Sequence, residues 1–149
     1  MAEKRNPLGA TGETVRGNVK AHRERLNLGF ADLARRLDDL GRPIPVLGLS
    51  RIEKGERRID ADDLVSLAAA LEISPLTLLM PDSADRTERV STTAHSDTAE
   101  HIFQWLRGDA LPCAYDDPQR QFQFMIRSRP KWAVSDAITR QGASTDGDD

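Results

Sequence analysis

The stretch GRPIPVLGLSRIEKGERR, residues 41–58, decides the fold of this chain. Its second half, SRIEKGERR, reads as the end of a helix, followed by a glycine and a basic turn. Glycine suits that place, because it adopts the left-handed conformation of a helix C-terminus at little cost. The first half, GRPIPVLGL, brings two prolines and a run of aliphatic residues with few hydrogen-bonding side chains. We expect a short helix from about Pro45 to Lys54, ended by Gly55.

Apolar periodicity predicts further helices on both sides of this one. One helix starts near Glu13 and ends before NLG, and a second begins near Gly29. Asp60 is a candidate N-cap for DADDLVSLAAAL, and Ser74, followed by proline, is one for SPLTLLM. Five short helices with tight connections predict an all-α bundle over residues 13–80.

The rest of the chain predicts a second, smaller module. Residues 1–12 and 81–96 lack apolar periodicity, so we expect an N-terminal arm and a linker there. Residues 97–134 contain a helix candidate, SDTAEHIFQWLRG, then LPCAY and the alternating QFQFMIRSR, which predict a β-hairpin. This gives a small α+β module of a helix plus a hairpin. Residues 135–149 are expected to form a disordered acidic tail.

Size and composition exclude several classes of protein. The 149 residues, with a net charge of −3, suit one small domain with an appended module. No apolar run approaches the roughly 18 residues that a membrane-spanning helix needs, and no secretory signal is evident. The single cysteine, Cys113, excludes an internal disulfide and a multi-cysteine zinc site. We expect a cytoplasmic protein.

Charge is distributed unevenly along the chain. Residues 1–80 contain 13 Lys and Arg against 12 Asp and Glu, whereas the remainder contains 8 against 12. Residues 41–58 alone hold five basic and two acidic side chains. A phosphate backbone responds to such a local patch rather than to the overall charge.

Cys113 and the three histidines, His22, His95 and His101, show no catalytic or metal-binding spacing. The chain also lacks a phosphate-binding glycine-rich loop. We expect no enzymatic activity, no metal, no cofactor and no small-molecule ligand.

Residues 15–79 resemble the Cro/C1-type (XRE) helix-turn-helix family of bacterial and phage repressors. The resemblance rests on Arg23, the pair Leu33–Ala34, SRIEKG at residues 50–55 and LEISPLTLL at residues 71–79. It implies a lambda-repressor-like fold and a sequence-specific DNA-binding transcriptional regulator, such as a phage immunity repressor. The partner implied is double-stranded DNA, with the third helix in the major groove. Whether the chain acts as a monomer or a homodimer stays open.

The resemblance also implies which residues contact DNA. They are Gly29, Phe30, Arg42, Val46, Leu47, Gly48, Ser50, Arg51, Lys54, Arg57 and Arg58. Glu53 lies on the inward side of its helix, where a buried carboxylate needs a partner, and Arg23 is the natural one. We expect Arg23 and Glu53 to form a structural ion pair.

Two departures from the family pattern matter for function. The spacing from Ala34 to Glu53 exceeds the family's usual one, and the prolines favour an enlarged turn between helices two and three. Val46 and Leu47 cannot donate hydrogen bonds to bases, although they can pack on thymine methyl groups, and Arg51 can still bind a guanine.

Two questions therefore stay open. The aliphatic residues 44–49 face DNA, are buried against the protein itself, or bind a protein partner as in an antitoxin or a partner of another regulator. In the second module, Arg127, Arg129 and Lys131 either touch DNA as an accessory element or only add solubility. The module itself is a candidate for dimerisation.

Overall fold

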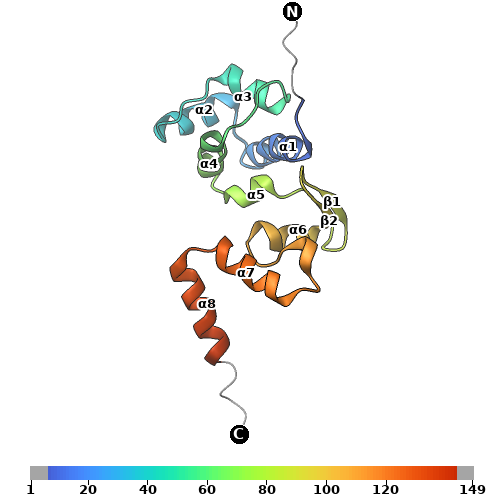
Figure 1. Cartoon of the computed structure of the whole chain (residues 1–149). Coiled ribbons are helices and arrows are strands. Elements are labelled where there is room, and N and C mark those ends of the chain that lie inside the picture. Colours follow the sequence, from blue (N-terminus) through green and yellow to red (C-terminus); the bar gives the residue numbers. More distant parts are fainter. Residues whose placement is uncertain (1–6, 144–149) are drawn as a thin grey trace, which may run out of the picture. The chain divides into compact units, whose positions relative to one another are not determined.

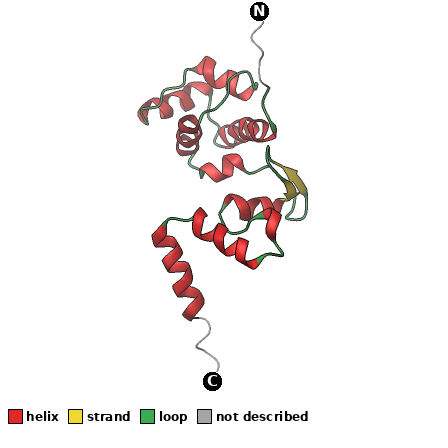
Figure 2. Cartoon of the chain, viewed as in Figure 1, coloured by secondary structure: helices red, strands yellow, loops and turns green. Residues whose placement is uncertain are grey.

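The computed structural model describes residues 7–143. The chain divides into two compact units, Met1–Ala99 and Glu100–Asp149. Figure 1 labels the elements along the chain, and Figure 2 shows that helices dominate in both units.

Helices form the larger part of the first unit. They are α1 (Ala10–Arg25), α2 (Phe30–Asp39), α3 (Val46–Glu53), α4 (Ala61–Ala70) and α5 (Pro75–Leu79). α1 packs against α3 and α5, and α2 packs against α3 and α4. The eight-residue α3 is too short to be stable alone, so its conformation depends on these neighbours.

One hydrophobic core joins these helices. Its fully buried members are Val15, Val19, Leu33, Leu37, Ile44, Leu49, Ile52, Leu67, Ala68, Ala70, Leu71 and Leu78. Most recur at the three- and four-residue spacing that places side chains on one face of a helix. Leu26 and Leu40 fit the same spacing but are 38% and 52% exposed, because each lies one residue beyond the end of its helix.

Polar caps begin α4 and α5, and a glycine follows the end of α3, where the sequence predicts them. The Asp60 carboxylate accepts a hydrogen bond from the Asp63 amide at 2.7 Å, and the Ser74 hydroxyl accepts one from Leu76 at 3.0 Å. Gly55 follows α3 with φ of 75°, in the left-handed region that favours glycine. These signals explain why α3 ends, and why α4 and α5 begin, close to the predicted residues.

Residues 40–45 connect α2 to α3 as an enlarged turn. Gly41 has φ of 77°, and the Arg42 amide donates to the Leu37 carbonyl at 3.0 Å, which closes the end of α2. Ile44 is 2% exposed and belongs to the core. The extra residues are therefore anchored to the domain by one buried side chain.

A β-hairpin that the sequence does not predict begins in the segment expected to be a linker, residues 81–96, and ends just beyond it. β1 (Arg89–Ser91) and β2 (Ser96–Thr98) pair antiparallel. The Thr92 hydroxyl accepts hydrogen bonds from the Ala94 and His95 amides and closes the turn. Side-chain turns of this kind order a polar segment without apolar periodicity.

This hairpin is attached to the beginning of α1. The Thr93 amide donates to the Thr11 hydroxyl at 2.9 Å, and the Thr11 amide donates to the Thr93 hydroxyl at 3.2 Å. The reciprocal pair joins residues 82 positions apart in the chain. The hairpin thus belongs to the helical unit that precedes it.

The β-hairpin predicted for residues 97–134 is absent from the described part of the C-terminal unit, which is helical. Its elements are α6 (Ala99–Leu106), the 3₁₀ turn η1 (Pro112–Ala114), α7 (Pro118–Ser128) and α8 (Lys131–Ala143). QFQFMIRSR lies in α7, so its prediction as a strand is wrong. Asp117 caps α7 by accepting from the Arg120 amide at 3.0 Å, and Pro118 takes the first helical position. These helix-start signals override the alternation that suggested a strand.

The two chain ends also differ from prediction within the described residues. α1 begins at Ala10, inside the predicted arm, whose residues 1–6 lie outside the described part. α8 extends to Ala143, inside the predicted disordered tail, and residues 144–149 lie outside the described part. Within residues 7–143, no helix combines the length and apolar character needed to cross a membrane.

Candidate nucleic-acid interface

α3 has one buried face and one exposed face. Leu49, Ile52 and Glu53 point into the domain, with 1%, 0% and 9% of their surfaces exposed. Leu47 is 61% exposed, and Arg51 is exposed one helical turn further on. Lys54, at the C-cap, is exposed as well, which gives the outer face an aliphatic start and a basic end.

The aliphatic stretch of residues 44–49 is divided between the core and the surface. Ile44 and Leu49 are buried in the core, whereas Val46 and Leu47 are 47% and 61% exposed. Gly48 is half-buried, and a Cβ atom there would lie 3.1 Å from Ile44 Cγ2. Pro45, Val46 and Leu47 are therefore the exposed residues of this stretch, and they are open to a partner of either kind, DNA or protein.

Arg23 and Glu53 form a two-pronged ion pair between α1 and α3. Arg23 Nε lies 2.6 Å from Glu53 Oε1, and Nη2 lies 3.0 Å from Oε2. The carboxylate raises the pKa of Arg23, chiefly through these hydrogen bonds. The Glu53 backbone carbonyl also accepts a hydrogen bond from Arg16 Nη1 at 2.9 Å, so two arginines of α1 hold the end of α3.

Phe30 and Gly29 lie at the beginning of α2, next to this pair. The Arg23 guanidinium lies over the Phe30 ring, 4.4 Å from its centre, and Phe30 is half-buried against the core. Gly29 is the exposed N-cap residue, and its amide donates to Asp32 at 3.3 Å. Phe30 thus packs against the hydrophobic core and the Arg23 guanidinium at the start of α2.

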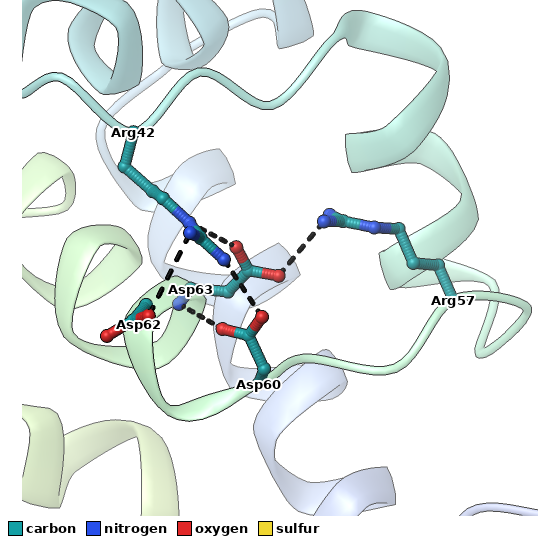
Figure 3. Close-up of polar contacts among 5 residues, drawn as sticks. All are labelled: Arg42, Arg57, Asp60, Asp62 and Asp63. Atoms are coloured by element: carbon teal, nitrogen blue, oxygen red, sulfur yellow. Dashed lines mark hydrogen bonds and ion pairs between the residues drawn. The ribbon is translucent and has the colours of Figure 1, made fainter.

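Arg42 and Arg57 converge on the beginning of α4, as Figure 3 shows. Asp63 Oδ1 accepts from Arg42 Nε at 3.1 Å, and Oδ2 accepts from Arg57 Nη2 at 3.0 Å. Arg42 also pairs with Asp60 at 2.8 Å and lies 3.9 Å from Asp62. The hydrogen bond to Asp63 is the main reason why the pKa of Arg42 is raised. We refer to the three aspartates, Asp60, Asp62 and Asp63, as the acidic cluster.

Comparison with known proteins identifies this part of the chain. Residues 19–78, which include the C-terminal part of α1, all of α2, α3 and α4, and most of α5, match the family model described as helix-turn-helix. The domain belongs to the Cro/C1-type helix-turn-helix family, XRE. This is a family of DNA-binding transcriptional regulators. No curated protein and no solved structure matches the chain.

In this helix-turn-helix domain, the arginines and lysines around α3 have different surroundings. Arg51 and Lys54 form no side-chain hydrogen bond or ion pair within residues 7–143. Arg42 and Arg57 are committed to the acidic cluster. Arg58 donates to the Pro7 carbonyl at 2.8 Å, which ties the loop after α3 to the chain segment before α1.

Ser50 is half-buried on the helix flank, between the exposed face and the core.

The three basic candidates of the C-terminal unit do not form a continuous cluster. Arg127 is exposed on α7, and Lys131 is exposed at the first position of α8. Arg129 lies between these helices and forms an ion pair with Asp109. Arg129 is thereby partly neutralised within its own unit.

Other reactive side chains show no assembled site. Cys113 is exposed, with Arg120 Nη2 at 3.6 Å from its sulfur. Burial, with a smaller contribution from the charge of Arg25, lowers the pKa of His22. Among the described residues, no group of His, Cys, Asp or Glu is arranged to hold a metal ion.

The acidic partners of Arg42 and Arg57 do not follow from residue spacing in the sequence. Asp60 carries a helix-cap signal, but no spacing rule pairs Asp63 with Arg42, 21 residues earlier. The same is true of Arg16, which reaches the end of α3 from 37 residues away. Charge complementarity between the basic stretch at residues 41–58 and DADD at residues 60–63 is the one signal available in the sequence.

Proposed function

We propose that the chain is a sequence-specific transcriptional repressor of bacterial or phage origin, with α3 placed in the major groove of DNA. The exposed face of α3 is the observation that carries this proposal. Leu47 is 61% exposed at its start, and Arg51 and Lys54 follow on the same side without side-chain partners in the described structure. A short helix with an unpaired basic face suits a negatively charged groove.

The residues of this face have distinct proposed roles. Arg51 is placed to bind a guanine, since its guanidinium can donate to both acceptors of that base. Lys54, at the helix end, serves as a phosphate contact. Val46 and Leu47 pack on thymine methyl groups, and Gly48 and Ser50 line the flank of the helix.

The remaining candidates lie at the edge of the proposed interface. Arg58 and Gly29 are exposed and suit phosphate contacts. Arg42 and Arg57 are neutralised by three aspartates, so their contribution to phosphate binding is smaller than the sequence suggests. Because few polar side chains are available to contact the bases, much of the sequence specificity would come from DNA shape.

A homodimer on a palindromic operator is the arrangement that we propose, with the C-terminal unit as the pairing element. Trp132 and Ile138 on α8 are 71% and 51% exposed, which is the support for a contact there. Arg127 and Lys131 would then be accessory DNA contacts. Sedimentation of the full chain with and without operator DNA tests the pairing.

The proposed function is tested by footprinting on the DNA that flanks the gene, together with binding measured over a series of salt concentrations. We expect a short protected site and a binding constant whose logarithm falls linearly with the logarithm of the salt concentration. A palindromic footprint supports a dimer, and a short asymmetric one supports a monomer. Absence of any protected site would contradict the proposal.

A protein-binding module is a second candidate, because Val46 and Leu47 expose adjacent aliphatic side chains at the start of α3. Leu47→Arg separates the two functions. On the DNA proposal, the added cation keeps or strengthens non-specific DNA binding and weakens discrimination of the site. Loss of a co-purifying protein partner, with no DNA binding by the wild type, would favour the second function.

A further inference from the structure

Asp63 is the most buried carboxylate in the acidic cluster. It lies in the first turn of α4, and its side chain is 2% exposed, against 61% for Asp60 and 82% for Asp62. A buried carboxylate must be paired to be stable.

Each oxygen of Asp63 binds an arginine from a different end of the segment that carries α3. Arg42 lies in the turn before the helix and contacts Oδ1 at 3.1 Å. Arg57 lies in the loop after the helix and contacts Oδ2 at 3.0 Å. One carboxylate thus fixes both flanks of α3 to α4, as the central contact in Figure 3 shows.

Arg57 also reaches the underside of α3 itself. A Cβ atom on Gly48, in the first turn of α3, would lie 3.8 Å from Arg57 Nη1. That nitrogen is buried and has no hydrogen-bond partner among the described residues. The contact with Asp63 is therefore what holds the guanidinium against the helix.

We propose that Asp63 is a positioning residue, which sets the orientation of α3 and hence its discrimination between DNA sequences without touching DNA. The inference rests on the proposed function, in which α3 reads the major groove. α3 has only eight residues, and two arginine contacts at its flanks restrict its rotation on the core. A small change in that rotation displaces every side chain on the exposed face.

Asp63→Asn tests the proposal, with Asp62→Asn as the matched control. Both variants remove one negative charge from the first turn of α4, but Asp62 is exposed and lies 3.9 Å from Arg42. Loss of charge alone strengthens binding to all DNA. The asparagine at position 63 keeps one acceptor and turns an amide toward the other arginine, so one flank is released.

The quantity to measure is the ratio of affinities for the operator and for unrelated DNA of equal length. We expect Asp63→Asn to lower this ratio about tenfold, comparable with the loss of one good base contact. Asp62→Asn should leave the ratio unchanged while both affinities rise. A partly unfolded variant loses both affinities equally, so the ratio does not report stability. An unchanged ratio in Asp63→Asn would overturn the proposal.

Hydrogen exchange provides a readout that does not depend on DNA. We expect faster exchange of the α3 amides relative to those of α1 in Asp63→Asn, and no such change in Asp62→Asn. If Asp63→Asn does not fold, Arg42→Gln releases the flank before α3 by changing the arginine, whose side chain is 40% exposed. Unchanged relative exchange in the folded variant contradicts the positioning role. If the wild type binds no DNA but exchange changes as expected, the proposed function alone fails.

Discussion

The Arg23 guanidinium joins α1 to α3 by donating to both carboxylate oxygens of Glu53, at 2.6 and 3.0 Å. It also donates to the Leu28 carbonyl at 2.8 Å and lies over the Phe30 ring. The side chains of the pair are 12% and 7% exposed. One side chain thereby holds the end of α3, the loop before α2 and the first residue of α2 together.

Arg23→Ala should destabilise the helix-turn-helix domain strongly, because it leaves the Glu53 carboxylate buried without its partner. We expect a loss of about 3–5 kcal/mol in the free energy of unfolding, measured by urea titration. Arg35→Ala is the control, since its pair with Asp32 is 70% and 44% exposed and contributes at most about 1 kcal/mol. Similar losses of unfolding free energy in Arg23→Ala and Arg35→Ala would show that the buried pair stabilises the domain no more than an exposed pair does.

Arg51→Ala and Lys54→Ala should affect DNA binding in different ways. Removal of a base contact at Arg51 should cost about 1–3 kcal/mol on the operator and relax the preference for one base. Removal of Lys54 should weaken binding on all sequences and reduce the salt slope by about one. Arg120→Ala removes the same charge from α7 and serves as the control. Equal effects on operator and unrelated DNA in Arg51→Ala would contradict a base-reading role.

Asn18 holds the end of α5 against α1, and its replacement should weaken the domain. Its side-chain nitrogen lies 3.2, 3.0 and 2.8 Å from the carbonyl oxygens of Thr77, Leu78 and Met80. Asn18→Asp replaces that donor by an acceptor, so we expect the free energy of unfolding to fall by about 1–3 kcal/mol or more. Thermal unfolding measures it. A smaller loss in Asn18→Asp than in Asn18→Ala would argue against the donor role.

Acid should remove the contribution of Asp60 to stability. Hydrogen bonding from the Asp63 amide, reinforced by the charge of Arg42, lowers the pKa of Asp60 below its ordinary value of 3.8. The folded state therefore binds this proton less tightly than the unfolded state does. The contribution of the Asp60 carboxylate to stability is complete when the pH is well above 3.8, and it is lost as the pH falls through the lowered pKa.

Asp60→Asn isolates this effect, because asparagine also caps helices but does not titrate. Urea titrations at several pH values should show the variant to be less stable than the wild type near neutrality. The difference should shrink to nothing at acid pH. A difference that stays constant with pH would rule out the lowered pKa as its cause.

The sequence predicted the parts of the fold that depend on local signals. The cap at Asp60, the left-handed Gly55 and the apolar spacing around Leu33 and Leu37 specify helices with little help from distant residues. The alternation in QFQFMIRSR predicts a strand, but the segment is helical, because alternation over a few residues also fits part of a helical face. There the cap at Asp117 was the stronger signal.

The candidate interface was only partly predictable, for a different reason. The exposure of Leu47 and Arg51 follows from helical spacing once Leu49 and Ile52 are placed in the core. The acidic cluster depends on tertiary packing of α4 beside the turn at Arg42, and no local pattern encodes that pairing.

The position of α3 on DNA can be tested directly by cleavage from a tethered iron chelate. The exposed Cys113 is first replaced by serine, and a single cysteine is then placed at position 47 or, as a control, at the 57%-exposed Val65 of α4. We predict cleavage within the footprint from position 47, at base pairs whose change lowers affinity, and far weaker cleavage from position 65. Cleavage from position 65 with none from position 47 would contradict the placement of α3 in the major groove.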